Sequence, residues 1–189
     1  MFRQAKQSDI PNPEPQTLSM LPQWLIDRLQ PLYPDARDRL IAFFEDCHKA
    51  GLYFYPLKDP VRTWLAQDSL YAIGRTTELT RKRVTDAKGG ESWHNYNVAI
   101  DGAFDADLTR DGVQWDWDTH KYKWSDVAEI AKKHGLTWGG SFDANKKVAL
   151  GDLGHYHISY GLTIHEAQEI YKLGGLAAVW REFDKKRGI

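Results

Sequence analysis

The chain has 189 residues, of which 42% are hydrophobic and 27% are charged, and this composition is typical of one folded globular domain. Its 25 basic and 26 acidic residues leave a formal net charge of −1, which argues against a broad polyanion-binding surface and against nucleic acid as the main partner. The single cysteine, Cys47, excludes an internal disulfide framework and a cysteine-rich zinc knuckle.

The N-terminal segment is predicted to be an extended tail. Pro11, Pro13 and Pro15 alternate with other residues, a pattern that favours an extended and poorly packed backbone over residues 1–17. The segment lacks the apolar core of a secretory signal peptide, and no stretch of the chain approaches the roughly 18 apolar residues of a membrane span. We therefore expect a single domain over residues 18–189 and no membrane span.

Two helices are predicted after the tail. Apolar residues recur at helical spacing over residues 18–32, and a second helix is predicted over residues 35–50 with Gly51 as its stop. The expected inner stripe of the second helix consists of Leu40, Ile41, Phe44 and Cys47. On such a stripe Cys47 is expected to be a small core residue rather than a reactive thiol.

The middle of the chain mixes strands and loops. Residues 51–56 and 93–100 predict strands, residues 61–73 are ambiguous, and residues 75–86 predict a polar surface helix. Residues 102–124 predict a long acidic loop that is rich in aromatic side chains. These side chains either line a cleft or pack the loop onto the body, and both interpretations stay open: Trp115, Trp117, Tyr122 and Trp124.

The C-terminal third of the chain is predicted to contain both helices and strands. A helix over residues 125–134 is predicted, with Ser125 as its cap and Gly135 as its stop. Residues 137–142 and 155–160 predict strands. A last helix over residues 163–181 is expected to be interrupted by a Gly-Gly pair at 174–175. This mixture of helices and separated strands indicates the α+β class.

Two short segments concentrate side chains that can perform chemistry. Residues 92–101 and 152–157 together contain three imidazoles and two carboxylates: His94, Asp101, Asp152, His155 and His157. Zinc in a hydrolytic site takes three protein ligands and leaves a fourth position for water. His94, Asp101 and His155 would provide that set. Asp152, three residues before His155, would be the general base.

The spacing alone leaves alternatives open. All of these residues could be ordinary polar side chains of the surface or core. If residues 155–160 form a strand, His155 and His157 point to the same face. That pair could then chelate a metal ion by itself, or His157 could lie beside the site and stabilise the transition state.

The two segments resemble the motifs of a known family. Ser92-x-His94-x6-Asp101, with Ala99, resembles the SxHxxGxAxD motif of zinc D-alanyl-D-alanine carboxypeptidases and L-alanyl-D-glutamate endopeptidases, enzymes that cut peptidoglycan stem peptides. Asn97 replaces the glycine of the motif, and asparagine tolerates the left-handed backbone that a glycine can adopt. The segment from Asp152 to Tyr156 resembles the acid-x-x-His motif of the same family.

Two further segments extend the resemblance over about residues 20–160. Trp138-Gly139-Gly140 resembles a segment of the endolysin-type branch, and Gly74-Arg75-Thr76 resembles the substrate-binding arginine segment. All four segments follow the order of the family. The resemblance implies a small central antiparallel sheet flanked by helices, with the zinc site at the sheet, as in the D-Ala-D-Ala peptidase or hedgehog-like fold.

The resemblance also implies roles for individual residues. It implies Zn²⁺ as the cofactor, with His94, Asp101 and His155 as its ligands, and Asp152 as the catalytic base. Arg75 would bind a substrate carboxylate or polarise the scissile carbonyl, and Ser92 would hydrogen-bond the substrate. His157, where many members of the family carry another residue, is our own candidate for a further substrate contact. For Arg75 the alternative is a surface ion pair with Glu78 or Asp86.

The implied substrate is the peptidoglycan stem peptide. We expect an L-alanyl-D-glutamate endopeptidase that acts as a phage or prophage endolysin, is made in the cytoplasm as a monomer and reaches the wall after release. The alternatives are a D-alanyl-D-alanine carboxypeptidase, a dipeptidase, or a cell-wall binding module without activity. A general base at Asp152 argues against the binding module, because a protein without activity does not need one.

Overall fold

The computed structural model describes residues 21–107, 114–141 and 152–189, so the predicted tail lies outside the described residues. The α-helices are α1 (Gln23–Leu29), α2 (Pro34–Lys49), α3 (Trp64–Ala72), α4 (Trp124–Lys133) and α5 (Ile164–Arg187). The strands are β1 (Phe54–Pro56), β2 (Ala99–Asp105), β3 (Trp115–Asp116), β4 (Thr137–Trp138) and β5 (His155–His157). Two short 3₁₀ helices are η1 (Trp93–Tyr96) and η2 (Gly139–Ser141). Within these ranges none of the helices has both the length and the apolarity that crossing a bilayer demands.

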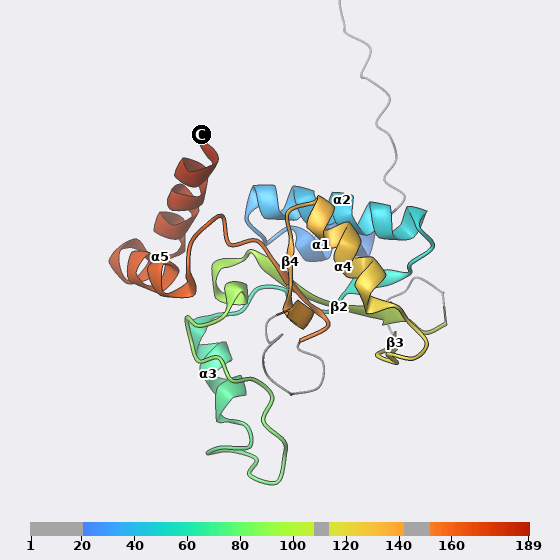
Figure 1. Ribbon diagram of the computed structural model, residues 1–189. Helices are drawn as coiled ribbons and strands as arrows, with labels where there is room; N and C mark the ends of the chain where they lie inside the picture. Colours follow the sequence, from blue (N-terminus) through green and yellow to red (C-terminus); the bar gives the residue numbers. More distant parts are fainter. Residues whose placement is uncertain (1–20, 108–113, 142–151) are drawn as a thin grey trace, which may run out of the picture.

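The five strands form one small sheet in which every described pair is antiparallel. The strand order is β1-β2-β5-β4, and β3 pairs with β2. Figure 1 shows α1, α2 and α4 together on one side of this sheet and α3 on the other side. The prediction of an α+β fold with a small antiparallel sheet flanked by helices is confirmed.

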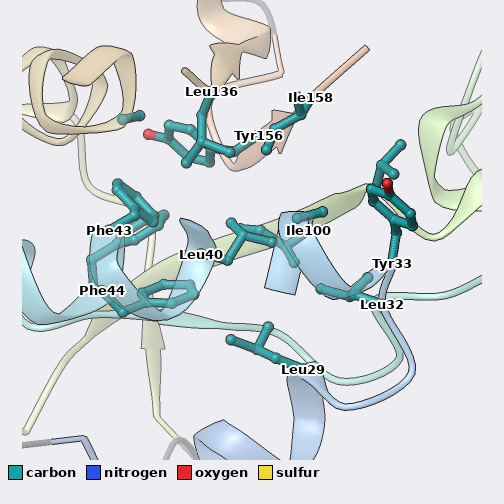
Figure 2. Close-up of a cluster of buried hydrophobic side chains, with 14 of the residues drawn as sticks. Leu29, Leu32, Tyr33, Leu40, Phe43, Phe44, Ile100, Leu136, Tyr156 and Ile158 are labelled. Atoms are coloured by element: carbon teal, nitrogen blue, oxygen red, sulfur yellow. The ribbon is translucent and has the colours of Figure 1, made fainter. Parts of the chain in front are cut away.

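The core lies between α2 and the sheet (Figure 2). Leu40, Phe43 and Phe44 of α2 are fully buried, as are Ile100 of β2 and Tyr156 of β5. The rings of Phe43 and Tyr156 lie 5.4 Å apart between centroids. Burial of each large apolar side chain contributes about 1.5–3 kcal/mol, and the contact between Phe43 and Tyr156 anchors α2 to β5.

The predicted inner stripe of α2 is right in three of its four positions. Leu40, Phe44 and Cys47 are fully buried, whereas Ile41 is only partly buried. Phe43, which was not in the predicted stripe, is fully buried and takes the place of Ile41.

The predicted surface helix at residues 75–86 is wrong, because this segment is a series of turns. Gly74 (φ +70°) and Glu78 (φ +44°) both adopt left-handed backbone, which a right-handed helix cannot contain. Between them Thr77 returns to form an isolated bridge with Ile73. The ambiguous stretch before this segment contains α3, whose first turn is capped by the Thr63 hydroxyl, which accepts from the Ala66 amide.

The strand predicted at residues 93–100 is divided into two elements. Ser92 and Asn95 form a capping box that starts η1, and β2 begins only after η1 has ended. The box satisfies two backbone amides at the start of η1 that would otherwise have no partner within the helix. The prediction was therefore wrong for residues 93–96 and right from Ala99 onward.

The aromatic segment is packed onto the body through three of its four side chains, Trp115, Tyr122 and Trp124. Trp124 is 5% exposed, and the Tyr122 ring stacks on Phe104 at 4.1 Å between centroids. Burial of Trp124 also moves the start of α4 to this residue. The predicted cap at Ser125 is therefore wrong, since the helix is preceded by Lys123 and has no side-chain cap. Trp117, in contrast, remains 47% exposed.

The predicted interruption of the C-terminal helix is confirmed. Gly174 and Gly175 both have non-helical dihedral angles, so α5 consists of two helical halves with a break between them. Near the C-terminal end, Arg187 pairs with Asp35 of α2 at 2.8 Å. This pair connects the second half of α5 to the core helices.

Candidate metal centre and active site

The candidate site forms where β2 and β5 lie side by side in the middle of the sheet. Asp101 and His155 are paired residues in this antiparallel ladder, so their side chains lie on the same face. His94 comes from η1, just before β2. Asn97 ends η1 with left-handed backbone (φ +59°, ψ +38°), the conformation expected of a residue that replaces the motif glycine. Two strands and one turn thus bring three side chains to one point.

The three candidate ligands meet at one carboxylate oxygen. His94 Nε2 lies 3.1 Å from Asp101 Oδ1, and His155 Nδ1 lies 3.2 Å from the same atom. One ligand atom from each residue lies within 4.8 Å of the others. Ligand atoms about 2.1 Å from a tetrahedral zinc ion are themselves about 3.4 Å apart, so the spacing suits such an ion.

The backbone carbonyl of Pro60 sets the tautomer of His94. His94 Nδ1 lies 2.7 Å from Pro60 O, and because a carbonyl only accepts, Nδ1 must donate. In a neutral imidazole the Nε2 lone pair then faces Asp101 Oδ1. Two acceptors at 3.1 Å repel each other unless a proton or a metal ion lies between them. The residues therefore fit a metal ion, and a hydrogen-bonded second ring nitrogen is typical of metal-binding histidines.

The two carboxyl groups of the site differ in their electrostatics. Burial alone would raise the pKa of Asp101, but His94 and His155 outweigh this effect and hold that pKa well below its ordinary value. Asp152 lines the same cavity. Partial removal from water and the negative charge of Asp101 raise the pKa of Asp152, although His155, His94 and Arg62 oppose the change. A raised pKa makes Asp152 a better proton acceptor than an ordinary aspartate.

His157 lies beside the three candidate ligands but is not one of them. It is opposite Ala99 in the ladder and 5% exposed, and its ring stacks on Trp93 at 5.4 Å between centroids. Burial, with the neighbouring His155 and His94, lowers the pKa of His157 to about 3, so this ring is neutral. Among the described residues, the group whose ligand atoms converge does not include His157.

A cavity of about 420 Å³ opens beside these groups. All but one of the side chains that the sequence predicted for the site line it: Ser92, His94, Asp101, Asp152, His155 and His157. Ser92 also caps η1, where its hydroxyl accepts from the His94 amide. The apolar part of the lining consists of Leu70, Val84, Ala87, Trp93 and Ile164.

Arg75 is the exception. It does not line the cavity formed by the described residues. Its guanidinium donates to the backbone carbonyls of Tyr71 and Thr85 and forms an ion pair with Asp86. The ion pair with Asp86, which the sequence left as the alternative, is the arrangement in the structure.

The arginine that lines the cavity is Arg62, which the sequence reasoning missed. Its Nη2 lies 3.6 Å from Asp101 Oδ2, and its Nη1 donates to Gln67 Oε1 at 2.9 Å. Arg62 stands in the stretch whose secondary structure was ambiguous. No local sequence pattern distinguishes Arg62, because its contacts with Gln67 and Asp101 are set by the fold.

The segment that resembles the endolysin-type branch packs beneath the site. A Cβ atom at Gly139 would lie 2.4 Å from Asp152 O and 2.9 Å from His155 Cβ, so only glycine fits there without movement. The Trp138 indole donates to Leu153 O at 2.8 Å. These contacts support the turn that carries Asp152 and the start of β5 at His155.

Comparison with known proteins points to the same region. Residues 85–158 match the family described as D-alanyl-D-alanine carboxypeptidase. Over 87 residues the chain is 42% identical to the peptidoglycan L-alanyl-D-glutamate endopeptidase CwlK of Bacillus subtilis (strain 168). That alignment covers 43% of this chain and 49% of CwlK, so the chain matches about half the length of this relative.

The fold also has a counterpart among solved structures. The structure of the LdcB LD-carboxypeptidase aligns with a TM-score of 0.50 at 19% identity, covering 76% of this chain and 71% of that one. At this identity the similarity concerns the fold alone. Together the comparisons confirm the resemblance to the family of D-alanyl-D-alanine carboxypeptidases and L-alanyl-D-glutamate endopeptidases, over the region that contains both motifs.

Proposed function

We propose that this protein is a zinc-dependent peptidase that hydrolyses the L-alanyl-D-glutamate bond of peptidoglycan stem peptides. The observation that carries the proposal is the convergence of His94, Asp101 and His155 within 4.8 Å, beside a cavity that Asp152 also lines. The choice of bond rests on the 42% identity to the endopeptidase CwlK in the aligned region.

In this proposal each residue of the site has a defined task. His94, Asp101 and His155 bind the zinc ion, which when present supplies a Lewis acid and lowers the pKa of a water molecule. Asp152 accepts a proton from the attacking water and passes it to the leaving amine nitrogen as the carbon–nitrogen bond breaks.

Arg62 replaces Arg75 as the proposed stabiliser of negative charge. Its guanidinium lines the cavity and is held by Gln67, so its donors are already oriented toward the space beside Asp101. Donors fixed before reaction stabilise a developing oxyanion without reorganisation. Ser92 and the neutral His157, both in the lining, are the proposed contacts for the peptide.

A second activity is favoured by one specific observation. The family that matches residues 85–158 is described as D-alanyl-D-alanine carboxypeptidase, so removal of a terminal D-alanine is the alternative reaction of the same site. The metal ligands and the base would be unchanged. Only the part of the stem peptide that occupies the cavity would differ.

We also propose that the protein acts as an endolysin-type enzyme that lyses the cell wall. The resemblance of the segment Trp138-Gly139-Gly140 to the endolysin-type branch supports this proposal. Clearing of isolated bacterial walls by the purified protein would support the lytic role. Cleavage of soluble stem peptides without clearing of walls would contradict it.

Product analysis by mass spectrometry tests the proposed reaction. Purified peptidoglycan is incubated with the protein, with and without a zinc chelator. New D-glutamate amino termini that are absent from the chelated sample would establish the endopeptidase, whereas loss of terminal D-alanine would establish the carboxypeptidase. Absence of any chelator-sensitive product would contradict both.

A further inference from the structure

One wall of the cavity has no secondary structure to hold it. Val84, Thr85 and Ala87 line the cavity, but residues 84–87 lie in neither a helix nor a strand. Figure 1 shows the chain leaving the end of α3, running away from the sheet and returning past α3 before it enters β2. The position of such a wall depends on contacts from neighbouring side chains.

Arg75 makes two contacts with the wall and a third with α3. Its Nη1 donates to Thr85 O at 2.8 Å and to Tyr71 O at 2.7 Å, so one group connects the wall to the last turn of α3. Its Nη2 pairs with Asp86. The guanidinium carbon lies 4.0 Å from the centre of the Tyr71 ring, and the Arg75 side chain is only 13% exposed. The planar fork of donors allows one side chain to make all three contacts.

Gln67 makes a second connection, which also reaches the metal group. It is fully buried, and its Nε2 donates to Ala87 O at 2.8 Å while its Oε1 accepts from Arg62. Because the guanidinium only donates and the carbonyl only accepts, the orientation of this amide is fixed. Arg62 in turn lies 3.6 Å from Asp101. The wall is therefore connected to the candidate ligands through two hydrogen bonds of Gln67 and the ion pair between Arg62 and Asp101.

We propose that Arg75 is a positioning residue that sets the distance between the wall at residues 84–87 and the metal group. It acts through Thr85 and Asp86 and contacts neither the ligands nor the substrate. Val84 and Ala87, together with Leu70 and Ile164, form an apolar surface that suits a small alkyl group such as the methyl of an alanine residue. This inference rests on the proposed peptidase function, because the substrate named here is the stem peptide.

The test compares Arg75→Met with Arg81→Met in the full-length, zinc-loaded protein. Arg81 is a matched control because it lies in the same irregular segment between α3 and η1. Among the described residues, its side chain pairs only with the exposed Glu78. Loss of the Arg75 contacts is expected to raise KM for a stem peptide about tenfold, while kcat changes less than about twofold. Arg81→Met is expected to change neither, and Arg75→Lys should restore part of the binding because it keeps the charge beside Asp86.

Two further readouts do not depend on activity. Amide hydrogen exchange, followed by mass spectrometry, is expected to accelerate over residues 84–87 in Arg75→Met and not in Arg81→Met. Bound zinc should equal that of the unmodified chain in both variants. If Arg75→Met does not fold, Asp86→Asn provides a second test, because Asp86 is exposed and its substitution removes only the ion pair that Arg75 makes with the wall.

Specific outcomes would overturn the proposal. Unchanged KM and unchanged exchange in Arg75→Met would show that the wall is held without Arg75. A parallel fall of kcat, zinc content and unfolding temperature with constant KM would show a merely structural role. If the unmodified chain yields no chelator-sensitive product, the proposed function fails, and the exchange measurement still decides whether Arg75 holds the wall.

Discussion

Asp101 and His155 are direct partners across β2 and β5, and Asp101 Oδ1 lies 3.2 Å from His155 Nδ1. The distance between these candidate ligands is therefore fixed by strand pairing rather than by a flexible loop. A slip of the register by one residue would move one of the two side chains to the opposite face of the sheet. Metal binding and correct pairing of the central strands should consequently depend on each other.

Replacement of Asp152 by asparagine should separate catalysis from metal binding. Asp152→Asn keeps the size of the side chain but cannot accept the proton of the attacking water. We expect kcat to fall about 10²–10⁴-fold, the usual contribution of a general base, with zinc content unchanged. Rates on purified stem peptides and zinc analysis of the same sample provide the check. Near-normal turnover would assign the base to another residue.

Asn97 offers a test of the backbone conformation that presents His94. Asn97→Ala should destabilise the fold by about 1–2 kcal/mol, because the residue has φ +59° and alanine is strained there. Asn97→Gly should cost less, since glycine is unstrained and only the bond from Asn97 Nδ2 to Pro31 O is lost. Urea unfolding of the two variants measures the difference. Equal stabilities would contradict the role assigned to the left-handed conformation.

Cys47 should be chemically silent in the native protein. It is fully buried in α2, and burial raises the pKa of its thiol, so little reactive thiolate is available. A disulfide reagent that reports free thiols is expected to give almost no reaction with the folded chain and one equivalent per chain in guanidinium. Rapid reaction under native conditions would show that the packing of α2 opens readily.

The sequence predicted most of the site because its residues belong to two short motifs. Spacing within each motif places His94, Asp101, Asp152 and His155, and the pairing of β2 with β5 then brings the motifs together. Arg62 could not be found in this way. It reaches the site from a separate segment, and only its tertiary contacts with Gln67 and Asp101 distinguish it from an ordinary surface arginine.

The errors in secondary structure have a common physical cause, which is that side-chain contacts overrode local propensity. The segment at 75–86 was predicted to be a polar helix, but Gly74 and Glu78 adopt left-handed backbone, and Arg75 bonds to Tyr71 O in α3 and to Thr85 O. Burial of Trp124 similarly decides where α4 begins, in preference to a cap at Ser125. Neither contact leaves a periodic signal in the sequence.

The most direct test of the metal centre is the zinc content of His94→Ala, Asp101→Ala and His155→Ala, each measured by mass spectrometry after dialysis against trace zinc. The unmodified chain is expected to retain about one zinc ion, and each variant far less, because three protein ligands are the usual set of a catalytic zinc. His134→Ala is the control, since His134 lies outside the site and pairs with Asp46. Stoichiometric zinc in any of the three variants would remove that residue from the ligand set, and its retention in all three would contradict a metal centre at this position.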